Sequence, residues 1–395
     1  MAEWITTTLE ECTDILGDGL HGTPKYTENG EYAFVNGNNL VDGEILIKKE
    51  TKRVDYSQYD KYKKPLTNRT ILVSINGTLG NVGVYGSEKI ILGKSACYFN
   101  VKESVDKDFI YYIVSSPTFK QYLESNATGT TIKNISLKQM REYTFELPEI
   151  GEQKRISSVL RKIDEKIKNN RAINNNLEEQ LSALFVNMFG HSIDSLDNSD
   201  IKLGDLIESV DNRGKTPPLS DEPTDYPIID VRALSSNSRI IDYTNCTKYV
   251  SKETYNNWFR SGHPKEYDIL ISTVGSLAEM KIFLGTTGCI AQNVVGFRTK
   301  DISPLYLYQY LNYIKNDLVA YNIGSVQPSI KVTHIIKHSI YVASKEDIEI
   351  FDSIARNITK KIFANCQENE ALKQMRDTLL PKLMSGEFDV SNIKI

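Results

Sequence analysis

Three short groups of residues have the types and spacing that could support chemistry. The first is GDGLHG, whose glycines at 17, 19 and 22 match the G-x-G-x-x-G fingerprint of a dinucleotide site. That site needs a strand before the motif and a helix after it, because the helix N-terminus holds the pyrophosphate. The loop sequence TPKYTENG follows instead, so we interpret these glycines as turn residues.

The other two groups are a histidine pair and two carboxylate–lysine clusters. His334 and His338 are four residues apart, as in zinc-binding helices, but the glutamate of H-E-x-x-H is missing and SIKVTHIIKHSIYVA is β-rich. The clusters EQK (152–154) and DEK (164–166) faintly match metal-dependent nucleases, yet alternating charges are ordinary on a solvated helix. The chain also lacks G-x-x-x-x-G-K-[ST] and an activated nucleophile. We therefore predict no catalytic residue and no metal ligand.

The composition is that of a globular protein without a membrane segment. The 395 residues favour two or three domains, with 40% hydrophobic and 25% charged residues. No apolar run is long enough to span a bilayer, and the acidic N-terminus lacks the apolar core of a signal peptide. The five scattered cysteines form no C-x-x-C pair, which disfavours disulfides and zinc. We expect a cytoplasmic protein.

The net charge of −4 disfavours a nucleic-acid binder unless basic residues cluster on one surface. One cluster exists in IKKETKRVDYSQYDKYKKPLTNR (47–69), where eight basic residues face three acidic ones. Tyr56, Tyr59 and Tyr62 lie between the basic residues. The stretch is either a contact surface or an ordinary solvated face, and both interpretations stay open.

The same order of segments occurs in both halves of the chain. ILVSINGTLG (71–80) corresponds to ILISTVGSLA (269–278), residues 129–148 correspond to 324–344, and residues 177–190 correspond to 372–386. The offset of about 195 to 198 residues is far too long for a solenoid repeat. It indicates two copies of one unit, in which a globular domain precedes a long helix.

Each globular part has the signals of a mixed α+β domain. AFVNGNNL, TILVSI and YTFELP are short apolar runs bounded by glycine, asparagine and proline, which predicts strands. Residues 107–126 and 303–321 carry apolar residues at three-to-four spacing, which predicts helices. We predict a first domain at 1–150, a helix at 151–190, a second domain at 191–343 and a second helix at 344–395.

The helical parts contain a seam of apolar residues with a seven-residue period. Its first copy is Ile156, Leu160, Ile163, Ile167, Asn170, Asn174, Leu177, Leu181, Leu184 and Met188. Its second copy is Phe351, Ala355, Ile358, Ile362, Asn365, Asn369, Leu372, Arg376, Leu379 and Leu383. A seam sustained over more than four heptads predicts a coiled coil.

Two asparagines occupy the same central seam positions in each copy. A buried seam asparagine lowers stability but fixes register, because a slipped pairing leaves its amide without partners. We predict that the two helices pair within the chain in antiparallel orientation, so that Asn170 and Asn174 meet Asn365 and Asn369. The alternative is that each helix packs on its own domain with these asparagines facing water.

Three segments together resemble the specificity subunit of type I restriction–modification systems. They are LPEIGEQKRISSVLRKIDEKI at the start of the first long helix, GTTIKNIS in the first domain and LLPKLMSGEFDV near the C-terminus. The resemblance spans nearly the whole chain. The second copy departs from it, because VASKEDIEIFDSIARNI lacks the Pro and Glu-Gln signature of residues 148–153.

The resemblance implies a fold, a function and a set of partners. Each globular part would be a target recognition domain that reads half of a split sequence in double-stranded DNA, and the paired helices would be the spacer. The helices would dock two modification subunits, which methylate adenine with S-adenosylmethionine, and restriction subunits that use ATP and Mg²⁺ could join. The chain itself would catalyse nothing and bind no cofactor.

We predict DNA contacts from loop residues with donors that reach base edges and phosphates. In the first domain these are His21, Thr23, Lys25, Asn36, Asn38, Asn39, Lys94, Thr130, Thr131, Lys133 and Asn134. In the second domain they are Arg213, Lys215, Thr216, Arg232, Asn293, Ser325, Gln327 and Lys331. Two competing hypotheses are a self-contained restriction–modification enzyme and a coiled-coil scaffold with protein-binding ends.

Overall fold

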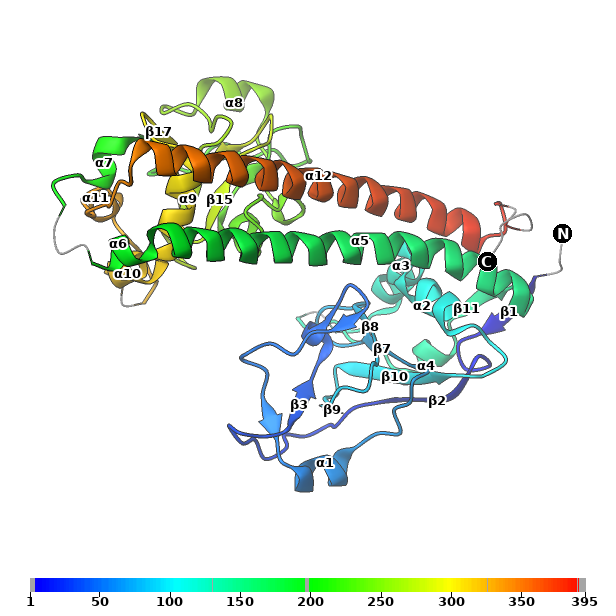
Figure 1. The fold of residues 1–395 in the computed structure, drawn as a ribbon. Coiled ribbons are helices and arrows are strands. Elements are labelled where there is room, and N and C mark those ends of the chain that lie inside the picture. The colour runs from blue at the N-terminus through cyan, green and yellow to red at the C-terminus, as the bar shows by residue number, and fades with distance from the viewer. Residues whose placement is uncertain (1–3, 130, 196–198, 325, 389, 391–395) are drawn as a thin grey trace. The chain divides into compact units, whose positions relative to one another are not determined.

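The computed structural model describes residues 4–129, 131–195, 199–324, 326–388 and 390, and it divides into two compact units (Figure 1). The first unit comprises residues 1–166 and 371–395, and the second comprises residues 167–370. Each unit contains strands, short helices and a part of each of two long helices, α5 (Ile150–Phe185) and α12 (Lys345–Met384). The predicted α+β class is confirmed.

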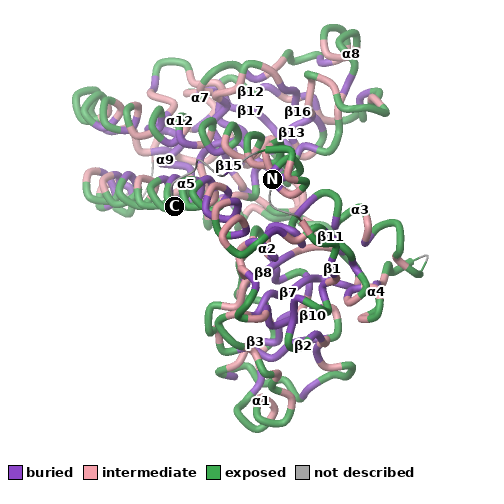
Figure 2. Tube along the Cα trace, turned by 90° about the vertical axis from the view of Figure 1, so that its right-hand side faces the viewer, coloured by how far each residue is buried: buried purple, intermediate pink, exposed green. Residues whose placement is uncertain are grey.

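The first unit is built around a four-stranded antiparallel sheet in the order β2-β10-β7-β8. All residues of β7 (Thr70–Ser74) and β10 (Ala96–Val101) are buried. Their sequences therefore show uninterrupted apolar runs rather than the alternation of a sheet with one wet face. Figure 2 shows this buried centre in purple, with the short helix α1 exposed at the periphery.

Smaller sheets and helices surround that sheet. Their bounds are β1 (Ile5–Thr8) with β11 (Thr144–Leu147), β3 (Tyr32–Val35) between β6 (Arg53–Val54) and β9 (Ile90–Leu92), and β4 (Leu40–Val41) with β5 (Glu44–Ile45). The main sheet is completed by β2 (Thr13–Asp18) and β8 (Val82–Val84). The helices are α1 (Tyr56–Tyr62), α2 (Lys107–Ser115), α3 (Pro117–Asn126) and α4 (Leu137–Arg141).

The second unit repeats this plan in the sheet order β12-β17-β14-β15. Phe297 lies opposite Ile269 there, as Phe99 lies opposite Ile71 in the first unit. The strands are β12 (Ile207–Val210), β17 (Val294–Thr299), β14 (Ile269–Ser272) and β15 (Met280–Ile282), with β13 (Ile228–Ile229) parallel to β16 (Cys289–Ile290). The helices are α6 (His191–Asp194), α7 (Leu203–Leu206), α8 (Lys252–Asn257), α9 (Pro304–Tyr313), α10 (Lys315–Ala320) and α11 (Val332–Ile335).

Two local predictions were wrong, and one was confirmed with a break. Residues 107–126 are helical as predicted, but they form two helices, because Pro117 disfavours helical geometry at Ser116, whose hydroxyl instead accepts from the Phe119 N–H at 3.1 Å. Residues 332–335 form the short helix α11 rather than a strand, since apolar periodicity cannot distinguish the two in so short a run. In GDGLHG, Gly17 belongs to strand β2 rather than to a turn.

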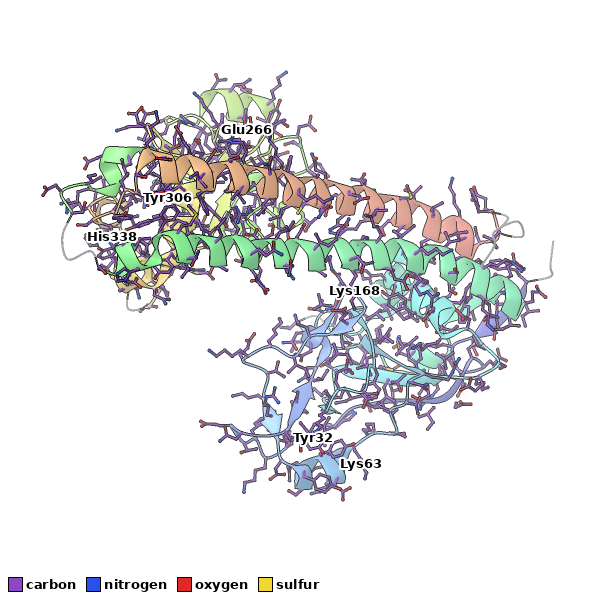
Figure 3. The ribbon with its side chains drawn as sticks, viewed as in Figure 1. Tyr32, Lys63, Lys168, Glu266, Tyr306 and His338 are labelled. Atoms are coloured by element: carbon purple, nitrogen blue, oxygen red, sulfur yellow. The ribbon has the colours of Figure 1, made fainter. Side chains whose placement is uncertain are left out.

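The long helices pack against each other in antiparallel orientation, as the seam predicted. In the first unit, Ile156 and Leu160 of α5 share a buried cluster with Leu380 and Leu383 of α12. In the second unit the order is reversed, because Leu181 and Phe185 near the end of α5 join Phe351 near the start of α12. The ring of Tyr306 on α9 completes this cluster, with its centroid 5.6 Å from that of Phe185 (Figure 3).

The four seam asparagines are buried and contact one another across the helix pair. Asn365 Nδ2 donates to Asn174 Oδ1 at 2.7 Å, and Asn170 Nδ2 donates to Asn369 Oδ1 at 3.0 Å. These contacts exclude the alternative in which the asparagines face water. The seam also accommodates Arg376, which pairs with Asp164 of α5 at 2.9 Å.

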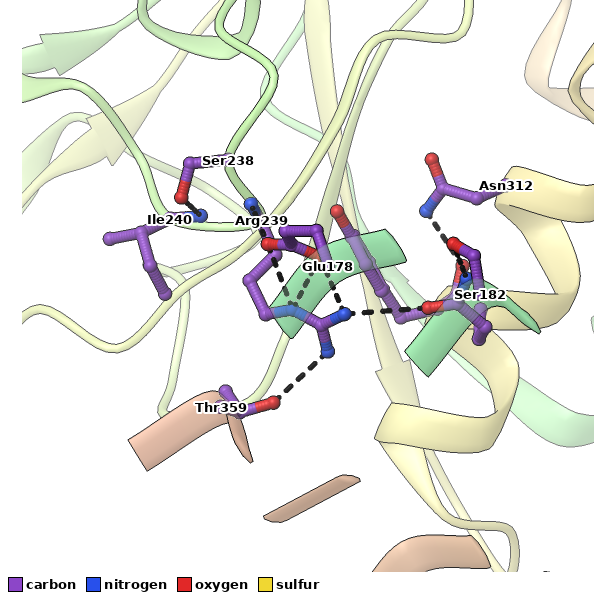
Figure 4. Close-up of polar contacts among 9 residues, drawn as sticks. Glu178, Ser182, Ser238, Arg239, Ile240, Asn312 and Thr359 are labelled. Atoms are coloured by element: carbon purple, nitrogen blue, oxygen red, sulfur yellow. Dashed lines mark hydrogen bonds and ion pairs between the residues drawn. The ribbon is translucent and has the colours of Figure 1, made fainter. Parts of the chain in front are cut away.

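A buried arginine attaches the second domain to both helices (Figure 4). Arg239 is 0% exposed, and its Nη2 lies 2.7 Å from Glu178 Oε2 on α5. Its Nη1 donates to Thr359 Oγ1 on α12 at 3.0 Å. Because the guanidinium is surrounded by acceptors, its burial is compensated only while Glu178 keeps its place.

We expect Arg239→Ala to lower the free energy of unfolding of the second unit by about 3–5 kcal/mol, because Glu178 would remain without its partner. The matched control is Lys345→Ala, whose ion pair with Glu349 is exposed and contributes about 0–1 kcal/mol. Urea unfolding followed through Trp258, in a chain with Trp4→Phe, measures both. Equal effects of the two substitutions would contradict this account.

Candidate nucleic-acid interface

Five segments of the first unit converge beside the ends of its strands. We name residues 20–25, 36–39, 75–77, 93–95 and 131–134 the first loop surface. Leu20 N–H donates to the carbonyl of Leu92, which precedes the 93–95 segment, at 2.7 Å, and Gly37 N–H donates to Ser95 Oγ at 2.9 Å. Ile75 N–H donates to the Ser95 carbonyl at 3.0 Å, and Gly77 N–H donates to the Lys133 carbonyl at 2.9 Å. The predicted residues of the first domain that the structure describes lie on these segments.

The second unit contains the same framework. We name residues 213–217, 230–232, 273–276, 291–293 and 326–331 the second loop surface. Thr273 N–H donates to Asn293 at 2.8 Å and Gly275 N–H donates to Pro328 at 3.0 Å, at the positions equivalent to Ile75–Ser95 and Gly77–Lys133. The repeat therefore extends to individual backbone hydrogen bonds, whereas the side chains carried by these loops differ.

The loop after β7 and the equivalent loop after β14 both need a left-handed backbone. Gly77 and Gly80 have φ values of +79° and +77°, and Gly275 has +85°. The position equivalent to Gly80 is Ala278, which keeps φ at +54° although a side chain disfavours it. The backbone N–H of Gly80 donates to the Ser74 carbonyl, and that of Ala278 donates to the Ser272 carbonyl. Each serine ends the preceding strand, so these bonds fix the turn.

Most of the predicted residues in the first domain are exposed. These are His21, Thr23, Lys25, Asn38, Lys94, Thr131 and Lys133, while Asn36 and Asn134 are half-buried and Asn39 is buried. Thr130 lies outside the described residues. The first loop surface is thus rich in exposed side-chain donors, among them three lysines, while the His21 ring contacts the Asp18 carboxylate.

Three predicted asparagines of the first domain make hydrogen bonds within it. Asn39 Nδ2 donates to the Leu46 carbonyl at 3.0 Å, and Asn36 Oδ1 accepts from Ser95 Oγ at 2.9 Å. Asn134 Oδ1 accepts from Asn76 Nδ2 at 3.0 Å. These amides hold the loops in place, so sequence reasoning missed the framework role of Ser95 and Asn76.

Two of the predicted residues of the second domain form ion pairs, and the others that the structure describes form none. Arg213 binds Asp211 at 2.6 Å, and its hydrogen bonds lower the pKa of the Asp211 carboxyl. Arg232 binds Asp230 at 2.7 Å and also donates to Thr247. Lys215, Thr216, Gln327 and Lys331 are exposed, Asn293 is half-buried, and Ser325 lies outside the described residues.

One groove brings three of these residues together. Thr216, Asn293 and Gln327 line it, with Gln292 and Lys248 at its wall. Gln292 has φ at +60°, and its side-chain amide donates to Thr216 Oγ1. Sequence reasoning missed Gln292 and Lys248, because only the fold brings their segments to residue 216. The groove offers hydroxyl, amide and ammonium groups of the kind that read base edges and phosphates.

Two cysteines of the second domain are buried. Burial raises the pKa of Cys246 and of Cys289 to about 12, so both thiols are protonated at neutral pH. No described group of three histidine, cysteine or acidic side chains is arranged to hold a metal ion. No described helix is long and apolar enough to cross a membrane.

Known proteins with the same organisation are specificity subunits. The chain is 24% identical to the type I restriction enzyme MjaIX specificity subunit of Methanocaldococcus jannaschii, over 94% of this chain and 87% of that protein. It is 21% identical to the MjaVIII specificity subunit of the same organism, over 83% of each chain. Its fold matches the crystal structure of the S subunit from M. genitalium with a TM-score of 0.54, at 20% identity, over 97% of this chain and 96% of that one.

The family described as the type I restriction modification DNA specificity domain matches residues 1–179 and 196–374. These two matches cover both globular parts and most of both long helices, in agreement with the internal repeat. The chain therefore belongs to the type I restriction–modification specificity family, and it is a non-catalytic specificity subunit with two target recognition domains.

Proposed function

We propose that the two loop surfaces read the two halves of a bipartite site in double-stranded DNA. The observation that carries this proposal is the shared backbone framework with different side chains at equivalent places. Ser95 corresponds to Asn293, Asn76 to Val274, and Lys133 to Pro328. Because base-edge recognition depends on the donors and acceptors presented, two such surfaces favour different half-sites and hence an asymmetric sequence.

In this proposal the paired helices act as the spacer between the two loop surfaces. Half-site spacing in DNA recognition follows the geometry of the protein that holds the reading elements. The buried contacts Asn174–Asn365 and Asn170–Asn369 oppose slippage of one helix along the other, because a shifted register would leave their amides buried without partners.

The long helices also dock the partner subunits in this proposal. Ile173 on α5 and Met375 on α12 are 45% and 53% exposed, which leaves apolar area for contact with other chains. The expected partners are two adenine-modifying subunits that hold S-adenosylmethionine, and restriction subunits that use ATP and Mg²⁺. The complex would act in the cytoplasm.

Genome-wide mapping of methylated adenines tests this proposal. In cells that contain the modification subunit, we expect one asymmetric bipartite motif to be methylated when this chain is present and unmethylated when it is deleted. Exchanging residues 1–150 with those of a related subunit should change one half of the motif only. An unchanged motif after the exchange would refute DNA reading by the first domain.

Replacing Gln327 with alanine should relax the preference at one base pair of the second half-site by about 1–3 kcal/mol, because an exposed amide in the groove is lost. The neighbouring Val326→Ala is the matched control, since Val326 is 97% exposed and carries no donor. Methylation rates on a set of single-base variants of the site measure both. A uniform loss of rate across all variants would instead indicate a phosphate contact.

Replacing Asn170, Asn174, Asn365 and Asn369 together with leucine should keep the helices paired but loosen their register. Leucine suits the seam, yet it carries no amide that a slipped pairing would leave unsatisfied. We expect methylation of sites whose central spacer is one base pair shorter or longer. The control is Asn175→Leu with Asn176→Leu, which alters exposed helix positions. Unchanged spacer preference in the fourfold variant would show that the asparagines do not set the register.

A further inference from the structure

The basic segment of residues 48–64 forms an exposed face of the first unit. It contains seven basic and three acidic residues. Among the residues that the structure describes, Lys48, Lys49 and Lys61 are exposed and form no ion pair. Lys63, by contrast, binds Asp60 at 2.7 Å. The face therefore carries positive charge that the rest of the unit does not neutralise.

Two contacts attach this segment to the first loop surface. Asn39 Nδ2 donates to the Leu46 carbonyl at 3.0 Å and to Thr51 Oγ1 at 3.2 Å, which fixes the chain on either side of Lys48 and Lys49. The Lys25 N–H donates to Gln58 Oε1 of α1 at 3.0 Å. A groove between residues 26–28 and 49–53 continues from this junction. The lysines are thus an extension of the loop surface rather than a separate patch.

The tyrosines of the segment have a structural role that the second unit repeats. Tyr59 of α1 stacks on Tyr32, which is labelled in Figure 3, with a centroid distance of 4.0 Å. Tyr255 of α8 packs on Tyr226 with a centroid distance of 4.5 Å. The lysines are not repeated, because α8 carries Lys252 beside Glu253 and no lysine in its last turn. The aromatic pair holds the helix in both units, whereas the exposed basic residues are fewer in the second unit, where Lys248, Lys252 and Arg260 are exposed.

We propose that residues 48–64 bind the phosphate backbone of DNA that flanks the half-site read by the first recognition domain. This inference rests on the proposed function. Lysine ammonium groups without acidic partners, on a surface continuous with base-reading loops, match the charge of a duplex that continues beyond its half-site. The equivalent segment of the second domain has fewer basic residues, so we expect the stronger contact with the flank beside the half-site of the first domain.

The test uses the full chain with Lys48→Gln, Lys49→Gln and Lys61→Gln, assembled with its modification subunits. We expect at least about tenfold weaker binding at 0.1 M salt, and a log Kd against log [salt] slope smaller by about 2–3, since each phosphate contact contributes about 0.9. The methylated sequence should not change. The control is Lys102→Gln with Lys107→Gln, which removes two charges from half-buried lysines that follow β10, at the end opposite to Lys94, and that donate to the Glu11 and Asn68 carbonyls.

Duplexes shortened from each end locate the contact. We expect the unaltered complex to lose affinity when one flank is removed, and the lysine variant to be insensitive to the same truncation. An unchanged slope and affinity in the variant would overturn the inference while the proposed function stands, provided that the unaltered complex still methylates its site. Loss of subunit assembly in the variant would also overturn it, because the face would then bind protein. If the unaltered complex shows no sequence preference, the proposed function itself fails.

Discussion

Neither recognition domain completes its apolar core without both long helices, and this constraint governs the rest of the structure. The core of the first unit includes Ile156 and Leu160 of α5 together with Leu380 and Leu383 of α12. The core of the second unit includes Phe185 of α5 and Phe351 of α12. A helix that slid by one heptad would empty both cores, at a cost of several kcal/mol for each large side chain removed. The domain cores therefore oppose a slide by a full heptad, whereas the seam asparagines oppose smaller shifts of register.

The two repeats attach the start of a long helix to its domain through different residues. In the first unit the buried Gln153 accepts from the Asp106 N–H at 2.8 Å and donates to the Pro148 carbonyl at 2.7 Å, which attaches α5 to the start of α2. The equivalent residue in α12 is Ile348, which can make neither bond. There Asp352 accepts from Ser303, the N-cap of α9, and also binds Arg356 at 3.0 Å.

This exchange explains why the second helix start departs from the family signature. The buried amide is replaced by an apolar side chain and an ion pair one turn further along α12, and a groove beside Ile348 and Asp352 remains open. The connection between helix and domain is kept, although the residues that make it are not. Duplicated domains can therefore diverge in sequence at a junction without losing the junction.

The parts of the fold that sequence reasoning predicted are those that depend on periodicity. The seam, the antiparallel pairing and the Asn174–Asn365 contact follow from a seven-residue spacing that repeats in both halves. The convergence of the loops could not be predicted, because residues 20–25, 93–95 and 131–134 meet only through strand order. Arg239 had no signal either: a single arginine in SSNSRIID looks like a surface residue until Glu178 and Thr359 surround it. The break at Ser116 was predictable, since a serine before proline is a strong helix start.

The distribution of charge explains how a chain with a net charge of −4 can read DNA. Several basic residues are engaged internally: Arg239 with Glu178, Arg376 with Asp164, and Arg298 with Asp268. They contribute little to the field outside, because each guanidinium lies against a carboxylate. The lysines of the first loop surface and most of those in residues 48–64 are exposed, so part of the outward positive field lies there. The net charge thus sums internally paired basic residues and exposed ones, and only the exposed ones are available to contact DNA.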